Sequence, residues 1–277
     1  MREAVAQARA EGRVGGTLWL YATYHCNLTC AYCLTESSPR VANRRELRPD
    51  AMLRLAREAR ELGFERIGIT GGEVFMLRWF PETLVELTRI LPTLTLTNAT
   101  LFTDRMLRRL APLAGLDAIL QVSLDSDDAR RNDEYRGPAN WRRVTETIPR
   151  LLERGLRVRV ATTVEDQTPD ELERLCDLHR RLGIPDEDHV VRPVVRRGRA
   201  RSAGMGVEMG VDDVLPELTI STDGAFLNPF APTVVDGRTE LDLLVSRQIL
   251  PLEIPLARLL SAVEGHPPGA DVVRNIR

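Results

Sequence analysis

The feature that most constrains this chain is a regular alternation of short apolar runs with longer amphipathic runs over residues 17–200. The short runs suit strands, and the longer runs repeat apolar residues at helical spacing. Six strands alternating with five helices predict a parallel α/β sheet that curls into a partial (β/α)6 TIM-like barrel. The expected strands are 17–23, 66–70, 94–98, 118–125, 156–164 and 189–195, and the expected helices are 49–62, 80–90, 103–110, 140–154 and 169–182.

Proline and glycine positions support the expected limits of one helix and predict an irregularity in another. Pro49 suits the first turn of the helix expected over 49–62, and Gly63 suits its end. Pro149 lies inside the helix expected over 140–154, where it predicts a kink or a break.

The alternation weakens near residue 200, so a short C-terminal extension is expected after it. Residues 218–226 predict a hairpin with its turn near Asp223-Gly224, and helices are expected near 240–248 and 254–263. The last dozen residues are expected to be frayed. The expected parts are a helical lead-in, a core barrel and the extension, over 1–16, 17–200 and 201–277.

Composition excludes several classes of protein. A net charge of -2 argues against a dedicated binder of nucleic acid or anionic membranes. No apolar run is long enough to span a membrane, and the charged start MREAVAQARAEGR lacks the apolar core of a secretory signal, so a cytoplasmic protein is expected. All 38 Lys+Arg residues are arginine, which excludes a P-loop lysine, a Schiff-base lysine and a lysine general base.

Three of the four cysteines fall close together, as Cys26, Cys30 and Cys33. This spacing is not typical of a disulfide framework and favours a metal site in a reducing compartment. A [4Fe–4S] cluster usually has four cysteine ligands, so three would leave one iron open for a small molecule. Zinc with His25 as a fourth ligand is an alternative, although the paired ligand spacing of zinc fingers is missing. Three unrelated buried cysteines are a further alternative.

The segment HCNLTCAYC, residues 25–33, resembles the cluster-binding loop of the radical SAM superfamily, C-x3-C-x-aromatic-C, with Tyr32 in the aromatic position. Residues 132–137, NDEYRG, are similar to the H-D-x-x-R-G stretch of members that modify peptides or build cofactors, with Asn132 where a histidine is frequent. Further matches follow the second, third and fourth expected strands, at Gly71-Gly72-Glu73, Thr97-Asn98-Ala99-Thr100 and Gln121-Val122-Ser123-Leu124-Asp125. The resemblance covers roughly residues 17–200.

This resemblance implies two cofactors, one [4Fe–4S] cluster and S-adenosylmethionine (SAM). The cluster would bind Cys26, Cys30 and Cys33, and the amino and carboxylate groups of SAM would chelate the open iron. The implied SAM-binding residues are Tyr32, Gly71, Gly72, Glu73, Asn98, Ser123, Asp125 and Arg136.

Four of these positions are expected to hold the methionine part of SAM. Glu73 would accept a hydrogen bond from the amino group, and Gly71-Gly72 would let the backbone approach closely. Arg136 would pair with the carboxylate through a two-pronged contact. Without the motif context, an exposed loop carboxylate is an equally good interpretation of Glu73, and a surface arginine is the better interpretation of Arg136.

The other positions are expected to hold the ribose, the methionine end or the base. Ser123 and Asp125 offer a hydroxyl and a carboxylate to the ribose or methionine ends, and Asn98 offers an amide to the pocket or the ribose. Tyr32 would pack beside the adenine. The alternative for Asn98 and Ser123 is a role in capping strand ends and forming turns.

The resemblance also implies a reaction. A reduced cluster would cleave SAM to methionine and a 5′-deoxyadenosyl radical, which would abstract hydrogen from a peptide or small-molecule substrate in natural-product or cofactor biosynthesis. A reductant such as flavodoxin or ferredoxin is implied. One alternative is a non-catalytic iron–sulfur redox or sensor protein that retains the fold, and another is a pseudo-enzyme scaffold that pairs with a second radical SAM protein.

The C-terminal part resembles a SPASM-type extension but departs from it at one point. Arg197-Gly198-Arg199-Ala200 resembles the segment that opens such extensions, and residues 218–229 resemble the hairpin before their cysteines. Asn228-Pro229-Phe230 stands where Pro-Cys is expected, and no cysteine follows Cys176. The chain thus resembles the MoaA/PqqE/SPASM-like branch with a degenerate extension that cannot hold an auxiliary cluster.

Residues outside these motifs carry weaker expectations. The arginines between Arg192 and Arg201 are expected to form a solvated basic loop, with phosphate or an acidic substrate as the alternative ligand. Thr162, Arg192 and Val194 are candidates to line a substrate site, although strand parity is not settled by the sequence.

The fourth cysteine is expected to have no chemical role. Cys176 shares a helix face with Leu172, Leu175 and His179, which is typical of a small core residue.

Overall fold

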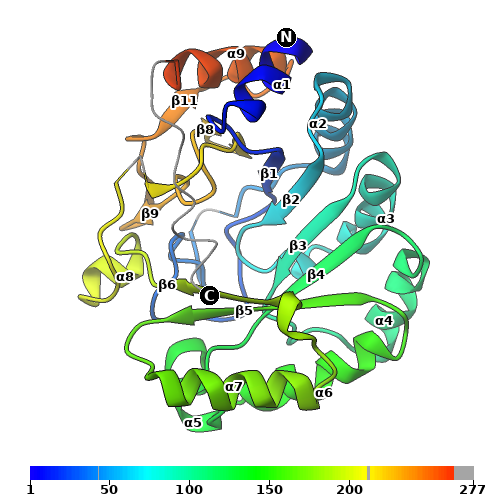
Figure 1. Cartoon of the computed structure of the whole chain (residues 1–277), viewed down its shortest axis with the longest axis vertical. Coiled ribbons are helices and arrows are strands. Elements are labelled where there is room, and N and C mark those ends of the chain that lie inside the picture. Colours follow the sequence, from blue (N-terminus) through cyan, green and yellow to red (C-terminus); the bar gives the residue numbers. More distant parts are fainter. Residues whose placement is uncertain (43, 211–212, 265–277) are drawn as a thin grey trace.

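A computed structural model describes residues 1–42, 44–210 and 213–264. A nine-stranded sheet in the order β11-β8-β7-β1-β2-β3-β4-β5-β6 runs through it (Figure 1). The six strands from β1 to β6 pair in parallel, each with the next, which confirms the expected α/β fold with a partial barrel. They are β1 (Thr17–Tyr21), β2 (Arg66–Thr70), β3 (Thr93–Thr97), β4 (Ala118–Ser123), β5 (Arg157–Val164) and β6 (His189–Pro193).

The five expected helices connect these strands and cover the outer face of the sheet (Figure 1). They are α2 (Pro49–Leu62), α3 (Phe80–Ile90), α4 (Asp104–Leu110), α6 (Asn140–Leu152) and α7 (Pro169–Arg181). The structure also contains α1 (Arg2–Ala10), within the expected helical lead-in, and α9 (Glu253–Ala262). It adds α5 (Ala129–Arg136), α8 (Arg199–Ser202) and the 3-10 turns η1 (Val74–Met76), η2 (Ala111–Leu113) and η3 (Asp186–Asp188). None of the described helices is long and apolar enough to cross a membrane.

Local sequence explains where several helices begin and end. Pro49 occupies the first turn of α2, and Gly63 ends it in the left-handed region at φ +89°. Thr168 and Glu171 form a reciprocal capping box at the start of α7. The break expected at Pro149 does not occur, since α6 continues to Leu152. Pro149 removes only the one backbone hydrogen bond that its missing N–H would have donated to the preceding turn.

Alternation along the strands divides side chains between two environments. In β1, Leu18 and Leu20 pack into the apolar core between sheet and helices, whereas Trp19 and Tyr21 face the inside of the partial barrel. This two-residue period is the reason that each strand contributes both to the core and to a cavity.

The C-terminal part extends the same sheet. Its strands β7 (Thr219–Ser221) and β8 (Gly224–Phe226) form the expected hairpin, and β7 pairs in parallel with β1. The prediction of a helix near 240–248 is wrong, because this segment contains β11 (Leu244–Ser246), which pairs with β8. Cross-strand pairing outweighs local helical spacing there. The division into parts at residue 200 stays a prediction.

The last described helix is α9, which confirms the helix expected near 254–263 and contacts α1 (Figure 1). A separate two-stranded ribbon is formed by β9 (Val234–Val235) and β10 (Arg238–Thr239). The expected fraying of the last dozen residues lies outside the described residues.

Candidate functional site

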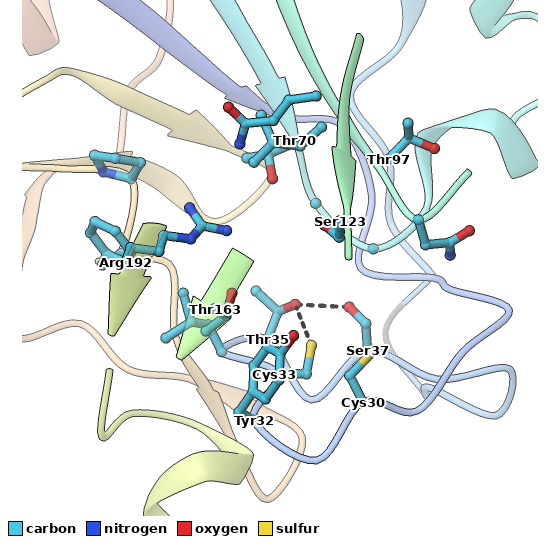
Figure 2. Close-up of a pocket in the computed structure, with 18 of the residues that line it drawn as sticks. Cys30, Tyr32, Cys33, Thr35, Ser37, Thr70, Thr97, Ser123, Thr163 and Arg192 are labelled. Atoms are coloured by element: carbon cyan, nitrogen blue, oxygen red, sulfur yellow. Dashed lines mark hydrogen bonds between the residues drawn. The ribbon is translucent and has the colours of Figure 1, made fainter. Parts of the chain in front are cut away.

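A cavity of about 300 Å³ lies inside the partial barrel and opens beside the loop that follows β1. The loop, residues 22–37, carries the three clustered cysteines, and all three line the cavity. Figure 2 shows Cys30, Tyr32 and Cys33 on one side of this space, with Ser123 and Thr163 on strands around it. The end of β1 therefore presents the cysteines where the parallel strands also end.

Polar groups surround the cysteine sulfurs. The backbone N–H of Leu28 donates to Sγ of Cys26 at 3.4 Å, and Nδ2 of Asn98 lies 3.7 Å from the same sulfur. The hydroxyl of Thr35 lies 3.6 Å from Sγ of Cys33 and 2.8 Å from the hydroxyl of Ser37 (Figure 2). Such donors stabilise thiolate charge and orient metal ligands.

The thiols fit an iron–sulfur cluster better than a single metal ion. Among the described residues, no three His, Cys, Asp or Glu side chains converge on one ion position, which argues against zinc with His25. The ligands of a cluster bind separate irons, so their sulfurs need not converge. Burial raises the pKa of Cys26 above its ordinary range and that of Cys30 to about 11, so cluster binding must displace their protons.

Gly71 and Gly72 lie against the cysteine loop, and they also line the cavity. A Cβ at Gly72 would overlap the carbonyl oxygen of His25, and one at Gly71, where φ is +139°, would overlap that of Thr23. The backbone N–H of Gly72 donates to the carbonyl of Thr23 at 2.7 Å, and that of Glu73 donates to the carbonyl of His25 at 2.9 Å. Glycine is therefore required at these two positions because the backbone of the cysteine loop leaves no room for a Cβ. A close approach of Gly71 and Gly72 to SAM stays a prediction.

Glu73 is fully buried and joins the ends of β2 and β3. Its carboxylate accepts hydrogen bonds from the hydroxyl of Thr97 at 2.9 Å and from the backbone N–H groups of Asn98 at 2.8 Å and Phe75 at 3.1 Å. Burial raises the pKa of Glu73 to about 7, although these hydrogen bonds oppose the shift. Its contact with SAM stays a prediction.

Asn98 fastens the end of β3 to the cysteine loop. Its Nδ2 donates to Oδ1 of Asn27 at 3.0 Å, and its Oδ1 accepts from the hydroxyl of Thr100 at 2.7 Å. Asn98 also lines the cavity, so it is placed both to hold Cys26 and to reach a ligand.

Asp125, Arg136 and Tyr32 form one buried network. Oδ2 and Oδ1 of Asp125 accept from Nε and Nη2 of Arg136 at 2.6 and 2.9 Å. The hydroxyl of Tyr32 donates to Oδ2, and the backbone N–H of Thr163 donates to Oδ1 at 2.9 Å. The guanidinium carbon of Arg136 lies 5.5 Å from the centre of the Tyr32 ring.

This network changes the expected roles of its members. Asp125 is fully buried, and both of its oxygens are engaged, so its geometry suits positioning better than contact with ribose. Arg136 and Tyr32 line the cavity, with the charge of Arg136 balanced by Asp125 behind it. Their contacts with SAM stay predictions.

Later strands complete the cavity wall. Ser123, Thr163, Arg192 and Val194 line it, whereas the candidate Thr162 does not, because its buried hydroxyl donates to the carbonyl of Leu124 at 2.8 Å. The sequence did not settle which side chains of this strand face inward. The structure shows that Thr163 faces the cavity and Thr162 does not.

The expected solvated basic loop between Arg192 and Arg201 is wrong, because Arg192 lies on β6 and lines the cavity, and the arginines from Arg196 to Arg201 have specific partners. Arg197 binds Asp242 at 2.8 and 2.9 Å, and Arg201 binds Glu240 at 2.7 Å. Arg199 donates to the carbonyl of Cys30 and, at 3.1 Å, to that of Ser37.

Sequence reasoning missed that Gly198 and Arg199 hold the cysteine loop. The backbone N–H of Arg199 donates to the carbonyl of Cys33 at 3.0 Å, and a Cβ at Gly198 would overlap the carbonyl oxygen of Leu34. The only available signal was the match of this segment to the opening of a SPASM-type extension.

The segment that replaces the expected Pro-Cys also forms part of the cavity wall. Pro229 and Phe230 line the cavity, and the carbonyl of Pro229 accepts from the hydroxyl of Tyr21 at 2.6 Å. The extension therefore closes one side of the site.

Cys176 lies apart from the site. It is half-buried on α7, with its sulfur 3.4 Å from Nδ1 of His189. Burial raises its pKa, so the thiol is not an activated nucleophile.

Comparison with known proteins places the chain in a family. The sequence model of the radical SAM superfamily matches residues 20–179. The chain belongs to the radical SAM superfamily, whose enzymes use a [4Fe–4S] cluster and SAM.

Curated relatives match the same region. The chain is 33% identical over 170 residues to molybdenum cofactor biosynthesis protein 1 of Drosophila melanogaster, covering 60% of this chain and 29% of the relative. It is 30% identical over 166 residues to a probable GTP 3′,8-cyclase of Archaeoglobus fulgidus, covering 58% and 54%. It is also 30% identical over 163 residues to the antilisterial bacteriocin subtilosin biosynthesis protein AlbA of Bacillus subtilis, covering 58% and 36%. The chain thus spans about half of these relatives' lengths or less.

Solved structures share the fold. Streptococcus suis SuiB bound to the precursor peptide SuiA matches with a TM-score of 0.62 and 14% identity, over 99% of this chain and 79% of that one. Native anSMEcpe with bound AdoMet and Cp18Cys peptide matches with a TM-score of 0.64 and 12% identity, over 88% and 81%. At these identities the similarity establishes the fold alone.

Proposed function

We propose that this chain is a radical SAM enzyme that abstracts hydrogen from a peptide or small-molecule substrate. The observation that carries this proposal is that Cys26, Cys30 and Cys33 line one cavity together with Gly71-Gly72, Asn98 and Arg136. When bound, the cluster supplies the electron that cleaves SAM and generates the 5′-deoxyadenosyl radical.

Different residues of the chain would bind the cofactors and position the groups that bind them. The three cysteines hold the cluster, and Asn98 and Arg199 fix their loop. Arg136 and Ser123 face the space where the methionine and ribose of SAM would bind, and Asp125 holds Arg136 in that direction. The apolar wall that includes Phe230 excludes water from the reacting groups.

Peptides are the substrate class that the comparisons favour, within the wider proposal. SuiB was solved with a precursor peptide and anSMEcpe with a Cp18Cys peptide, and AlbA is named for bacteriocin biosynthesis. We further propose a flavodoxin- or ferredoxin-type reductant, a cytoplasmic setting and no nucleic-acid partner.

Anaerobic cluster reconstitution followed by measurement of 5′-deoxyadenosine tests this function. With dithionite and SAM, the wild-type protein should release 5′-deoxyadenosine. Cys30→Ala should lose both the brown chromophore and cleavage, whereas Cys176→Ala, which lies outside the cavity, should keep both. An intact cluster without detectable SAM binding would instead favour the non-catalytic iron–sulfur alternative.

A further inference from the structure

The cavity has a cationic lining. Among the described residues, its walls include four arginines and no aspartate or glutamate. Asp125 neutralises one of them, Arg136, from behind. Arg66 and Arg159 lie toward the amino ends of β2 and β5, whereas Arg192 lies near the carboxyl end of β6. The site lies at the carboxyl ends of the strands. Of the two cavity arginines at that end, Arg136 pairs with Asp125, whereas Arg192 has no such carboxylate partner among the described residues.

The guanidinium of Arg192 points into the cavity. Figure 2 shows it on the wall across from Ser123, with Thr163 nearby. Thr163 and Arg192 are paired positions of β5 and β6, so the sheet register places the Thr163 side chain beside this cation. Within the described ranges, no hydrogen bond or ion pair connects the Arg192 guanidinium to another residue.

An unpaired charge in such a place is costly, because burial removes its hydration. Burial lowers the pKa of Arg192, yet a guanidinium remains charged at any physiological pH. The other arginines from Arg196 to Arg201 all have acidic or carbonyl partners. Among the residues that the structure describes, Arg192 is thus the arginine of this run whose guanidinium has no hydrogen-bond or ion-pair partner, so a bound anion can take that place.

We infer that the substrate carries a carboxylate or phosphate group, and that Arg192 binds this group inside the barrel. This inference rests on the proposed function. A guanidinium contacts both kinds of oxyanion through two parallel hydrogen bonds. The hydroxyls of Thr163 and Ser123 line the same space and can donate to the remaining oxygens.

The substrate is a better source of this anion than SAM. The SAM carboxylate is expected on the open iron, beside the cysteine loop, where Arg136 lies. The carbonyl of Arg136 is itself 3.8 Å from Sγ of Cys30. Arg192 lies on a different wall, on β6, and no hydrogen bond joins it to that loop within the described residues.

The first measurement uses inorganic phosphate as the probe, on reconstituted protein without SAM. At constant ionic strength, replacing chloride by phosphate should raise the melting midpoint of the wild type by about 2–4 °C. Arg192→Gln should lose this response, whereas the control Arg201→Gln, whose side chain is half-exposed beside Glu240, should keep it. If Arg192→Gln fails to fold, Arg192→Lys takes its place as the test variant. This variant keeps the charge without the planar fork, so its response to phosphate should be reduced.

The second measurement separates the two sources of the anion. Equilibrium dialysis should give SAM affinities for wild type and Arg192→Gln that agree within about twofold. A loss of about tenfold or more would assign the anion to SAM and overturn the inference about the substrate. Equal phosphate responses in wild type and Arg192→Gln, or no response in the wild type, would also overturn it. Failure of the wild type to bind SAM would instead count against the proposed function.

Discussion

The guanidinium of Arg136 contacts both carboxylate oxygens of Asp125, at 2.6 and 2.9 Å. This pair joins the end of β4 to the end of α5, and Tyr32 and Thr163 attach the cysteine loop and β5 to the same carboxylate. One buried aspartate after β4 therefore binds three further elements around the cavity: α5, the cysteine loop and β5.

Asp125→Asn should destabilise the protein and loosen the cysteine loop. Removing one member of a buried ion pair leaves the other charge uncompensated, so a loss of about 3–5 kcal/mol in the free energy of unfolding is expected. Urea unfolding of the cluster-free protein measures it. Asp127→Asn is the control, because its ion pair with the half-exposed Arg174 should be worth about 1 kcal/mol or less. Similar losses in both variants would contradict the central role of Asp125.

Arg199→Gln should lower the reduction potential of the cluster. Arg199 places a cation against the carbonyl of Cys30, and a nearby cation favours the more negative reduced state. A decrease on the order of tens of millivolts is expected in a titration followed by electron paramagnetic resonance. Arg201→Gln should leave the potential unchanged, because that side chain binds Glu240. An unchanged potential in Arg199→Gln, with normal iron content, would refute this electrostatic role.

Gly72→Ala should impair cluster binding through a steric conflict with the cysteine loop. The added Cβ would overlap the backbone of His25, so the loop or the end of β2 must move. Gly115→Ala is the matched control, because its φ is +83° and nothing lies within 4 Å of the added Cβ. The control should cost about 1 kcal/mol with full iron content. The interpretation fails if Gly72→Ala also incorporates iron normally.

Acid should weaken the fold through two histidines in contact, His179 on α7 and His189 on β6. The rings of His179 and His189 lie 4.3 Å apart in an edge-to-face contact. Burial lowers the pKa of His179 to about 3 and that of His189 to about 4, from the ordinary histidine value of 6.5. The unfolded chain therefore binds more protons between these limits, so stability should be greatest above pH 6.5 and fall as the pH drops toward 4.

His179→Leu tests this pH dependence. Within the described residues, neither ring nitrogen of His179 has a hydrogen-bond partner, so an apolar replacement removes a desolvation cost. Urea unfolding as a function of pH should show a smaller decline below pH 6.5, with no loss of stability at neutral pH. A decline as steep as that of the wild type would show that other groups control the acid response.

Much of the core followed from local pattern. Helix α2 was predictable because Pro49 and Gly63 mark its ends and apolar residues repeat at helical spacing between them. The segment 240–248 was not, because β11 depends on pairing with β8, a partner distant in sequence. Short edge strands carry little local signal.

The sequence by itself determined the chemistry of the site: three cysteines on one short loop, and motifs at successive strand ends that place the chain in the radical SAM superfamily. The spacing of the cysteines and the succession of strands along the chain can both be read directly from one sequence. Only the tertiary structure decided that Asp125 and Glu73 turn inward to hold neighbouring elements, and that Thr163 faces the cavity in place of Thr162. Within the described part of the chain, it also left the Arg192 guanidinium without a hydrogen-bond partner, whereas the arginines after it have partners. These outcomes depend on strand register and on contacts between distant segments, which no local pattern contains.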